Sequence, residues 1–303
     1  MGTCFKFWTG GQAPADDGNM FGCASHGLVN AGAWVAPGQP SEARFELRVS
    51  SEAIAGSYSE VLSRVGRLEY RPAAAIILFA GATGMEGFLS RWYELMPGVP
   101  VAGGGAARVG GQIQGEIRPA ASDVAVLLIR DGTWQVESLN VHNATGRLVE
   151  VKADGPRLIT HIREAGAGEW EAAARFFRGR QVAEGRNGDD YESITFSDIG
   201  GRNVHLSVDG EVLRSGADLP ADMRMEVRTV SRADVAARLT RFCNCRESLV
   251  FGCAGLRGLL DAPLAVGHGT LVGFMFGELV TTGSHPQFAN LMAVRMREIG
   301  ASA

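Results

Sequence analysis

The chain has 303 residues, of which 46% are hydrophobic and 20% charged, which is enough apolar material for one large core or two coupled ones. A net charge of −4 and scattered arginines argue against a nucleic-acid partner, because phosphate binding needs clustered positive charge. The longest apolar runs, residues 73–80 and 124–129, are much shorter than the roughly 20 residues of a membrane-spanning helix. Residues 1–6 lack a secretory signal pattern. We therefore expect a cytoplasmic protein without membrane contact.

The first half of the chain has the pattern of a mixed α/β protein. Residues 1–40 are rich in Gly, Ala and Pro, and we expect loops around one short strand near residues 19–24. The patterns that follow predict, in chain order, a strand at 43–49, a helix at 53–68, a buried strand at 73–79, a helix at 84–95, a short strand at 100–102 ending in a turn at Gly103-Gly104-Gly105, and a hairpin of 124–129 with 134–141 about Asp131-Gly132.

The second half contains the same kinds of element. Its patterns predict, in order, a helix at 170–177, a hairpin of 204–207 with 211–213 about Asp209-Gly210, a strand at 224–230, a helix capped by Ser231 that runs to about Phe242, buried strands at 248–251 and 270–274, and a helix or strand-helix mixture at 286–299.

Two segments share one order of elements: strand, small-residue turn, helix, strand, small-residue turn. The first runs from Ala75 to Gly105 and the second from Ser248 to Gly277. This order is typical of a βαβ unit, in which the strands are parallel and ligands bind beyond their carboxyl ends. We therefore expect an α/β fold of two related mixed α/β halves, whose βαβ units pack around a shared ligand cleft. The alternative is a chance match between two ordinary βαβ units, which are common.

The five cysteines are spread unevenly, at positions 4, 23, 243, 245 and 253. They are too few and too irregular for a disulfide scaffold, and their number fits a reducing compartment. Cys243 and Cys245 form a C-x-C pair without a second pair downstream, which fits neither a zinc ribbon nor a C-x-x-C redox motif. We expect no metal site.

Several short motifs occur in a fixed order along the chain. They are FGCASHG at 21–27, VAGGGA at 101–106, GEVLRSGADLPADMR at 210–224, SLVFGCAGLR at 248–257, LVGFMFGE at 271–278 and FAN at 288–290. Together they make the chain resemble the FIST family, a bacterial small-ligand sensory module, more closely in the second half than in the first. The resemblance implies a FIST N-like domain at 1–155 and a FIST C-like domain at 156–303.

The resemblance also implies a cytoplasmic protein that binds a small molecule such as an amino acid or a small carboxylate. Some family members look like haem proteins that sense nitric oxide. Haem is therefore an alternative here, although no C-x-x-C-H motif occurs, with His26, His142, His161 and His285 as conceivable ligands.

The chain departs from the family pattern at three points. The first part is shorter than is usual in the family, and Leu256 stands where the family has an Arg directly after Cys-x-Gly, with Arg257 one place later. No kinase, cyclase or methyl-accepting output domain follows. Signalling would then need a separate partner protein, and a homodimer is also left open.

Three residues of the second half are candidates for ligand contact. Cys253 follows a buried strand, and the positive charge of Arg257 and a helix N-terminus nearby would lower the pKa of its thiol and make it a nucleophile or a ligand contact. The alternative interpretation is that Cys253 is a small buried apolar residue. Arg257 is a candidate partner for a ligand carboxylate, with a surface Arg as the alternative, and Arg108 is its counterpart in the first half. Glu278 follows an apolar run and is a candidate for binding a ligand amine or acting as a base, with a structural salt bridge as the alternative.

The remaining ligand-binding candidates are His26, Gly103 and Gly104. The segment from Gly103 to Arg108 resembles a dinucleotide-binding motif, but Arg108 stands where the third Gly belongs and no acidic residue follows at the required spacing. We interpret the glycines as a close approach of the backbone to a ligand or to the other half.

The competing function is an enzyme, a hydrolase or lyase that acts on a small polar metabolite in the cleft. Cys253, Glu278 and His285 would then form a nucleophile, orienter and base, provided that the fold brings them together.

Overall fold

The structure is a computed structural model of the chain, and the residues that it describes form four β-sheets and few helices. It describes residues 5–9, 19–24, 28–30, 33–35, 45–47, 50–80, 84–106, 108–113, 116–117, 123–180, 195–197, 202–204, 206–216, 218–219, 222–229, 231–257, 260, 264–275, 277–282, 285–289 and 292–300. For some of these positions the structure describes the backbone but not the side chain. They are the positions given above that fall within 5–47, 106–117, 178–180, 195–197, 222, 232, 257, 281–282 and 285. The fold class is mixed α/β, as the sequence predicts.

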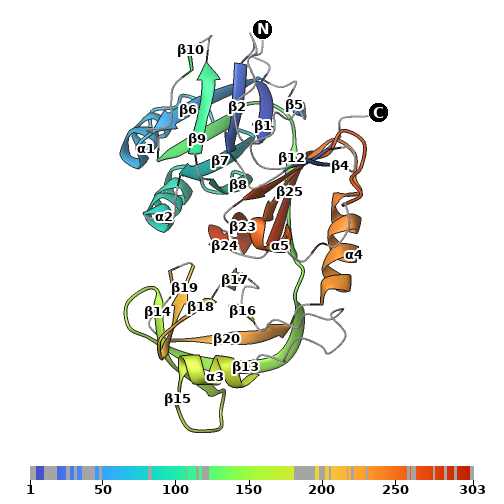
Figure 1. Cartoon of the computed structure of the whole chain (residues 1–303). Coiled ribbons are helices and arrows are strands. Elements are labelled where there is room, and N and C mark those ends of the chain that lie inside the picture. The colour runs from blue at the N-terminus through green and yellow to red at the C-terminus, as the bar shows by residue number, and fades with distance from the viewer. Residues whose placement is uncertain are drawn as a thin grey trace.

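Two six-stranded sheets, named here sheet B and sheet C, form the centre of the molecule (Figure 1). Sheet C has the order β24-β23-β8-β7-β11-β6, from β6 (Ser51–Gly56), β7 (Ala74–Ala80), β8 (Val101–Ala106), β11 (Val124–Ile129), β23 (Glu278–Thr282) and β24 (His285–Ala289). Sheet B has the order β12-β25-β21-β22-β3-β4, from β3 (Leu28–Asn30), β4 (Ala33–Val35), β12 (Trp134–Asn140), β21 (Ser248–Cys253), β22 (Leu271–Met275) and β25 (Met292–Glu298).

Side chains alternate between the two faces of each sheet, and this alternation builds four layers. One face of sheet C packs against α1 (Tyr58–Val65) and α2 (Met85–Leu95), through residues such as Ile77, Phe79, Val61, Phe88 and Trp92. Its other face packs against sheet B, through Ile76, Leu78, Leu127, Phe251, Leu271 and Val294. The far face of sheet B packs against α4 (Arg232–Cys243), through Val250, Val272, Val235 and Leu239.

A third sheet, sheet D, lies at the other end of the view from the N-terminal strands (Figure 1). It contains β13 (Asn143–Ala153), β14 (Leu158–Glu164), β15 (Glu171–Ala172), β16 (Thr195–Ser197), β17 (Asn203–Val204), β18 (Leu206–Asp209), β19 (Val212–Ser215) and β20 (Asp222–Thr229), with α3 (Ala173–Arg180) packed on it. Leu206, Leu213 and Leu219 share a core with Phe88 of α2, so sheet D is packed against the layers above it.

The fourth sheet, sheet A, has the order β10-β9-β2-β1-β5. Its strands are β1 (Phe5–Thr9), β2 (Asn19–Ala24), β5 (Phe45–Leu47), β9 (Arg108–Ile113) and β10 (Glu116–Ile117). The sequence predicts only β2 within residues 1–40, and it misses β1, β3 and β4. No helix in the described part of the chain is long and apolar enough to cross a membrane.

Both predicted strand pairs of the βαβ units are parallel. β7 pairs in parallel with β8, and α2 lies between them in the chain. β21 pairs in parallel with β22, and α5 (Ala254–Arg257) follows β21 directly. Strands from before and after the predicted boundary at 155/156 share hydrogen bonds in both sheets, since β23 pairs with β8 and β22 pairs with β3. The division into two halves with a shared cleft stays a prediction.

Three predicted elements are wrong. Residues 124–129 and 134–141 form no hairpin, because β11 is buried on both faces between β6 and β7 while β12 pairs with β25 of the other sheet. Within 286–299, where we expected a helix or a strand-helix mixture, the described residues form β24 and β25, because pairing with β23, β12 and β21 overrides their helix-forming residues. Residues 103–105 continue β8 and form no turn.

Two predicted helices begin later than expected, and a predicted hairpin is confirmed. The helix expected from residue 53 starts after Ser57, whose capping box with Glu60 ends β6 and opens α1. The helix expected at 170–177 starts after β15, at Ala173. β18 and β19 form the hairpin expected about Asp209-Gly210. Ser231 occupies the N-cap position of α4 as predicted, but its side chain makes no capping hydrogen bond.

Candidate functional site

The chain crosses from sheet B to sheet C at Gly277, directly after the end of β22. Gly277 has φ of 93°, and a Cβ there would overlap the ring of Phe288 and lie 2.8 Å from the carbonyl oxygen of Ala289. Only glycine fits this crossover without displacement of β24. The Gly277 carbonyl accepts a hydrogen bond from the backbone N–H of Gly105, at 3.1 Å, which fixes the crossover against β8.

The glycines of β8 are needed for this close contact. A Cβ at Gly103 would overlap the carbonyl oxygen of Ile77 on β7. A Cβ at Gly104 would overlap the carbonyl oxygen of Gly277 and lie 3.1 Å from the Cβ of Met275. The close backbone approach expected at Gly103 and Gly104 is therefore to neighbouring protein strands, and the carboxyl ends of β8 and β22 lie against each other.

Glu278 is the first residue after the crossover, opposite Gly104, and its side chain is fully buried. It shares the face of Val280, so it points between sheets C and B. Oε2 accepts a hydrogen bond from the backbone N–H of Met292 at 3.3 Å, and Oε1 has no hydrogen-bond partner among the described residues. Burial raises the pKa of this carboxyl well above its ordinary value, and the hydrogen bonds from Met292 and Cys253 lower it only in part.

Cys253 reaches the same point from sheet B. It is the last residue of β21, it is 7% exposed, and its thiol hydrogen bonds to the Glu278 carboxyl. Its neighbours in the sequence are small, and Gly255, two positions later, is exposed, but the cysteine also belongs to the apolar core between sheet B and α4. The structure thus brings together two residues that the sequence singles out, from strands 25 positions apart and in different sheets.

The other predicted site residues are placed only in part. The backbone of Arg108 lies in β9 of sheet A and that of Arg257 at the end of α5; neither side chain is described. His26 lies outside the described residues. His285 pairs with Thr282, four positions along β23 from Glu278, so their backbones are about 13 Å apart at roughly 3.3 Å per residue.

A second group of buried polar side chains, which the sequence analysis missed, lies where sheet D joins sheet B. The amides of Asn140 and Asn203 hydrogen bond reciprocally, both at 2.9 Å, and the Asn203 amide nitrogen lies 2.8 Å from Nδ1 of His142. The backbone N–H of Asn203 lies 3.5 Å from the sulfur of Met292, whose own N–H binds Glu278. Asn203 is 63 positions from Asn140, and the three residues match no motif, so no local signal identifies them.

This network fixes the tautomer of His142. The backbone N–H of His142 donates to Oδ1 of Asn140, which orients that amide and, through the reciprocal bonds, the amide of Asn203. The Asn203 amide nitrogen therefore donates to Nδ1, and Nε2 carries the proton. Nε2 has no hydrogen-bond partner among the described residues. Burial, followed by the nearby positive charges of Arg228 and Arg238, lowers the pKa of His142 to about 4.

A buried cation completes the junction between sheet D and sheet C. Arg202, just before β17, is 6% exposed and donates to the carbonyl of Phe288 at 3.4 Å. Its Nη1 lies 3.5 Å from Oε1 of Glu86 on α2, an ion pair whose geometry falls short of a hydrogen bond. Burial raises the pKa of Glu86, and the charge of Arg202 opposes that rise.

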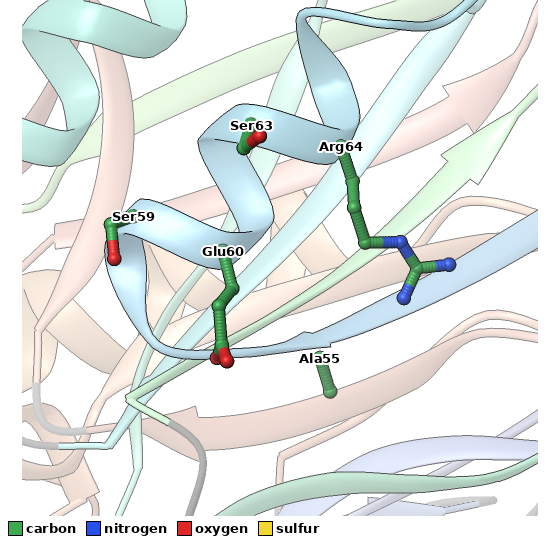
Figure 2. A pocket seen from close by; sticks show the side chains of 5 residues that line it. All are labelled: Ala55, Ser59, Glu60, Ser63 and Arg64. Carbon is green, nitrogen blue, oxygen red and sulfur yellow. The ribbon is translucent and has the colours of Figure 1, made fainter.

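A separate surface depression of about 520 Å³ lies on α1 and β6, as Figure 2 shows. Its described lining residues are Ala55, Ser59, Glu60, Ser63 and Arg64. Glu60 already accepts a hydrogen bond from the backbone N–H of Ser57 at 2.8 Å, so its carboxylate caps the helix. None of the predicted site residues is among these lining residues, and we do not assign the site there.

Across the described parts of the chain, no group of three or more His, Cys, Asp or Glu side chains could hold a metal ion. Comparison with protein-family models finds no match, and comparison with curated proteins finds none either. The site is therefore defined by its geometry: a thiol and a buried carboxyl that meet across two sheets, at the ends of two parallel strand pairs.

Proposed function

We propose that this chain is a small-molecule-binding protein of the FIST sensory type, with an amino acid or a small carboxylate as its ligand. The observation that carries the proposal is the free oxygen of Glu278. A fully buried carboxyl oxygen without a hydrogen-bond partner is costly, by about 1–3 kcal/mol, and a bound polar group would recover that cost.

The position of Glu278 also supports the proposal. It lies beside the carboxyl ends of β7–β8 and β21–β22, the edge of parallel strands at which α/β proteins commonly bind ligands. The glycine contacts at Gly104 and Gly277 fix the backbone that carries it, so the carboxyl is held before any ligand arrives.

The protonation of Glu278 separates two ligand chemistries. A ligand carboxylate or carbonyl would accept a hydrogen bond from the neutral acid, and its affinity would fall as pH rises and the acid ionises. A ligand ammonium group would need the ionised carboxylate, so its binding would release a proton and its affinity would rise with pH.

Thermal unfolding in the presence of individual amino acids and small carboxylic acids tests the proposal. A ligand at about 100 times its Kd stabilises a protein by about 2.7 kcal/mol. We expect at least one compound to raise the unfolding temperature progressively as its concentration increases above its Kd. Repeating the titration of that compound from pH 6 to pH 8 then distinguishes the two chemistries.

The matched variants are Glu278→Gln at the site and Glu94→Gln on the exposed surface of α2. Glu278→Gln should abolish the stabilisation or remove its pH dependence, and Glu94→Gln should leave both unchanged. Absence of any stabilising compound, or equal stabilisation of all three proteins, would contradict the proposal.

An enzyme is the second candidate function, and the hydrogen bond between Cys253 and Glu278 favours it, because a thiol beside a carboxyl is a pair that can pass a proton. Alkylation by iodoacetamide tests it. A nucleophilic Cys253 should react at neutral pH and more slowly in Glu278→Gln, whereas an inert Cys253 would leave only the binding function.

A further inference from the structure

Cys245, the second cysteine of the C-x-C pair, lies against a positive charge. It belongs to the loop at 244–247 between α4 and β21, where it is partly exposed and its neighbours Asn244 and Arg246 are exposed. The guanidinium of Arg295 on β25 donates a hydrogen bond to its sulfur. The loop therefore presents to solvent a thiol that already has a cation beside it.

The backbone that carries this thiol is fixed against the segment before β22. The carbonyl of Cys245 accepts a hydrogen bond from the hydroxyl of Thr270 at 2.5 Å. The backbone N–H of Gly267 donates to the carbonyl of Cys243 at 2.9 Å, and a Cβ at Gly267 would overlap the carbonyl oxygen of Cys245. The thiol is therefore held in position before a reactant arrives.

Ser248 provides a second donor for a negative sulfur. Its hydroxyl oxygen lies 2.9 Å from the sulfur of Cys245 and 3.2 Å from the hydroxyl oxygen of Thr270. Because Thr270 gives its own proton to the Cys245 carbonyl, Ser248 can direct its proton either to Thr270 or to the sulfur. A sulfur that gains negative charge would then have two donors, Ser248 and Arg295.

The charges around Cys245 leave an excess of positive charge. Glu137 on β12 forms an ion pair with Arg295 and lies 3.7 Å from Arg297, so one carboxylate is shared by two guanidinium groups. The side chain of Arg297 is 41% exposed. Arg246 and Glu247, which follow Cys245 in the loop, are both exposed and cancel in charge. An anion that approaches from solvent would be attracted to this loop.

We propose that Cys245 forms mixed disulfides with small anionic disulfides, so that this loop is a site of reversible thiol modification. The sulfur of Cys245 attacks one sulfur of the disulfide, a new S–S bond forms and the original S–S bond breaks. The leaving thiolate takes up the proton that the Cys245 thiol gives up, so that thiol and disulfide yield a mixed disulfide and a new thiol.

Two features of the loop favour this reaction. Negative charge is shared among the sulfurs during the exchange, and Arg295 and Ser248 are placed to stabilise it. The excess positive charge raises the local concentration of an anionic reagent, and salt weakens this attraction. The reaction needs no ligand at Glu278, so it goes beyond the proposed function and does not depend on it.

The other described cysteines provide an internal comparison. Cys243 is fully buried, and burial, together with the charge of Cys245, raises its pKa to about 12, which suppresses its thiolate. Cys253 is 7% exposed and belongs to the core between sheet B and α4. Both should react slowly in the folded protein, and Cys245 should react fastest of the three.

The test compares two disulfides of similar size, dithiodiglycolate, which is anionic, and 2-hydroxyethyl disulfide, which is neutral. The full chain is treated with each at neutral pH, and peptide mass spectrometry measures the rate of mixed-disulfide formation at each cysteine. The same measurement in urea gives the rates for the unfolded chain. The ratio of the anionic rate to the neutral rate then reports charge, because the exposure of the thiol affects both rates.

We expect this ratio at Cys245 to be several-fold higher in the folded protein than in the unfolded chain. It should fall toward the unfolded value between about 0.01 M and about 1 M salt, over which the Debye length shortens from about 30 Å to about 3 Å. An equal ratio in the folded and unfolded chains, or faster reaction at Cys243 or Cys253 than at Cys245, would overturn the proposal. These results need no variant to fold.

Three variants test the role of Arg295. Arg295→Gln should lower the ratio at Cys245 several-fold, and Arg295→Lys, which keeps the charge, should retain most of it. Arg91→Gln removes an exposed arginine of α2 and should leave the ratio unchanged. An unchanged ratio in Arg295→Gln, with the variant folded by circular dichroism, would overturn the role of Arg295. Ligand binding is not measured in this experiment, so its failure is separate from failure of the proposed function.

Discussion

Glu278 is the residue at which burial and charge conflict most clearly. Its carboxyl is fully buried, and no described side chain forms an ion pair with it. In the folded protein its pKa is raised, so the folded state holds this proton more tightly than the unfolded chain does. The resulting stabilisation is fully present below the unfolded pKa, which is near 4.5, and it is lost as pH rises toward the folded value.

We therefore predict that Glu278→Gln removes a penalty that grows with pH. The variant should gain stability relative to the unaltered protein between pH 5 and pH 8, with the largest difference at the upper end. Urea unfolding at four pH values measures this, with Glu94→Gln as the surface control. A constant difference across the range would show that Glu278 is not held protonated.

His142 predicts the opposite dependence. Its folded pKa of about 4 is below the unfolded value of 6.5, so the folded state binds its proton less tightly and loses stability as pH falls from about 6.5 to 4. The full loss is up to about 3 kcal/mol at roughly 1.4 kcal/mol per unit. His142→Gln should flatten the stability profile over this window, and a profile as steep as that of the unaltered protein would contradict the assignment.

At the scale of elements, the glycine crossover between β22 and β23 sets the site. Gly277→Ala would place a methyl group against Phe288 and force a positive φ on alanine, so we expect a loss of stability of about 3 kcal/mol or more. Gly87 is the matched control, because it lies inside α2 with open space at its Cβ position, and Gly87→Ala should stabilise by about 1 kcal/mol. Thermal unfolding of both variants checks the prediction, and effects of the same sign would contradict it.

The sequence predicts the buried strands and the parallel pairs because these depend on local composition. β7, β21 and β22 are mostly apolar runs that are buried along their length, apart from Ala80 at the end of β7, and such runs are visible without a structure. Pairing across the molecule is not encoded locally. Asp131-Gly132 resembles a hairpin turn, yet the strands on either side of it join different sheets.

The candidate site shows the same division. The small-residue motif around Cys253 and the polar residue after an apolar run at Glu278 predict both residues, but their contact depends on the packing of sheet B on sheet C. Asn140 ends β12, His142 follows it before β13, and Asn203 begins β17; no local pattern connects them, and their network appears only in the folded protein.

At the scale of the whole molecule, one polar junction connects sheet D to the site. Asn203 is bonded to Asn140 and His142 and touches Met292, which in turn holds Glu278. A change in the position of sheet D would therefore reach Glu278 through a short chain of contacts. These contacts connect the candidate site to sheet D within the described part of the molecule.

We predict that Asn203→Ala destabilises the protein by about 1–3 kcal/mol, because it leaves the half-buried amide of Asn140 and the buried ring of His142 with fewer partners. Hydrogen exchange should rise in β17 and in β25, on both sides of the junction. Asn143→Ala is a comparison in a more exposed position, bonded to Asp234 at 2.9 Å, and should affect exchange locally. A rise confined to β17 would contradict coupling between sheet D and the site.

The central claim is that Cys253 and Glu278 belong to one ligand site, and the most direct measurement is protection of Cys253 from alkylation. We predict that at least one amino acid or small carboxylic acid slows the reaction of iodoacetamide with Cys253 at the concentrations that stabilise the protein, and leaves the rate at Cys245 unchanged. Undiminished alkylation of Cys253 in the presence of every such compound, or equal slowing at both cysteines, would contradict the claim.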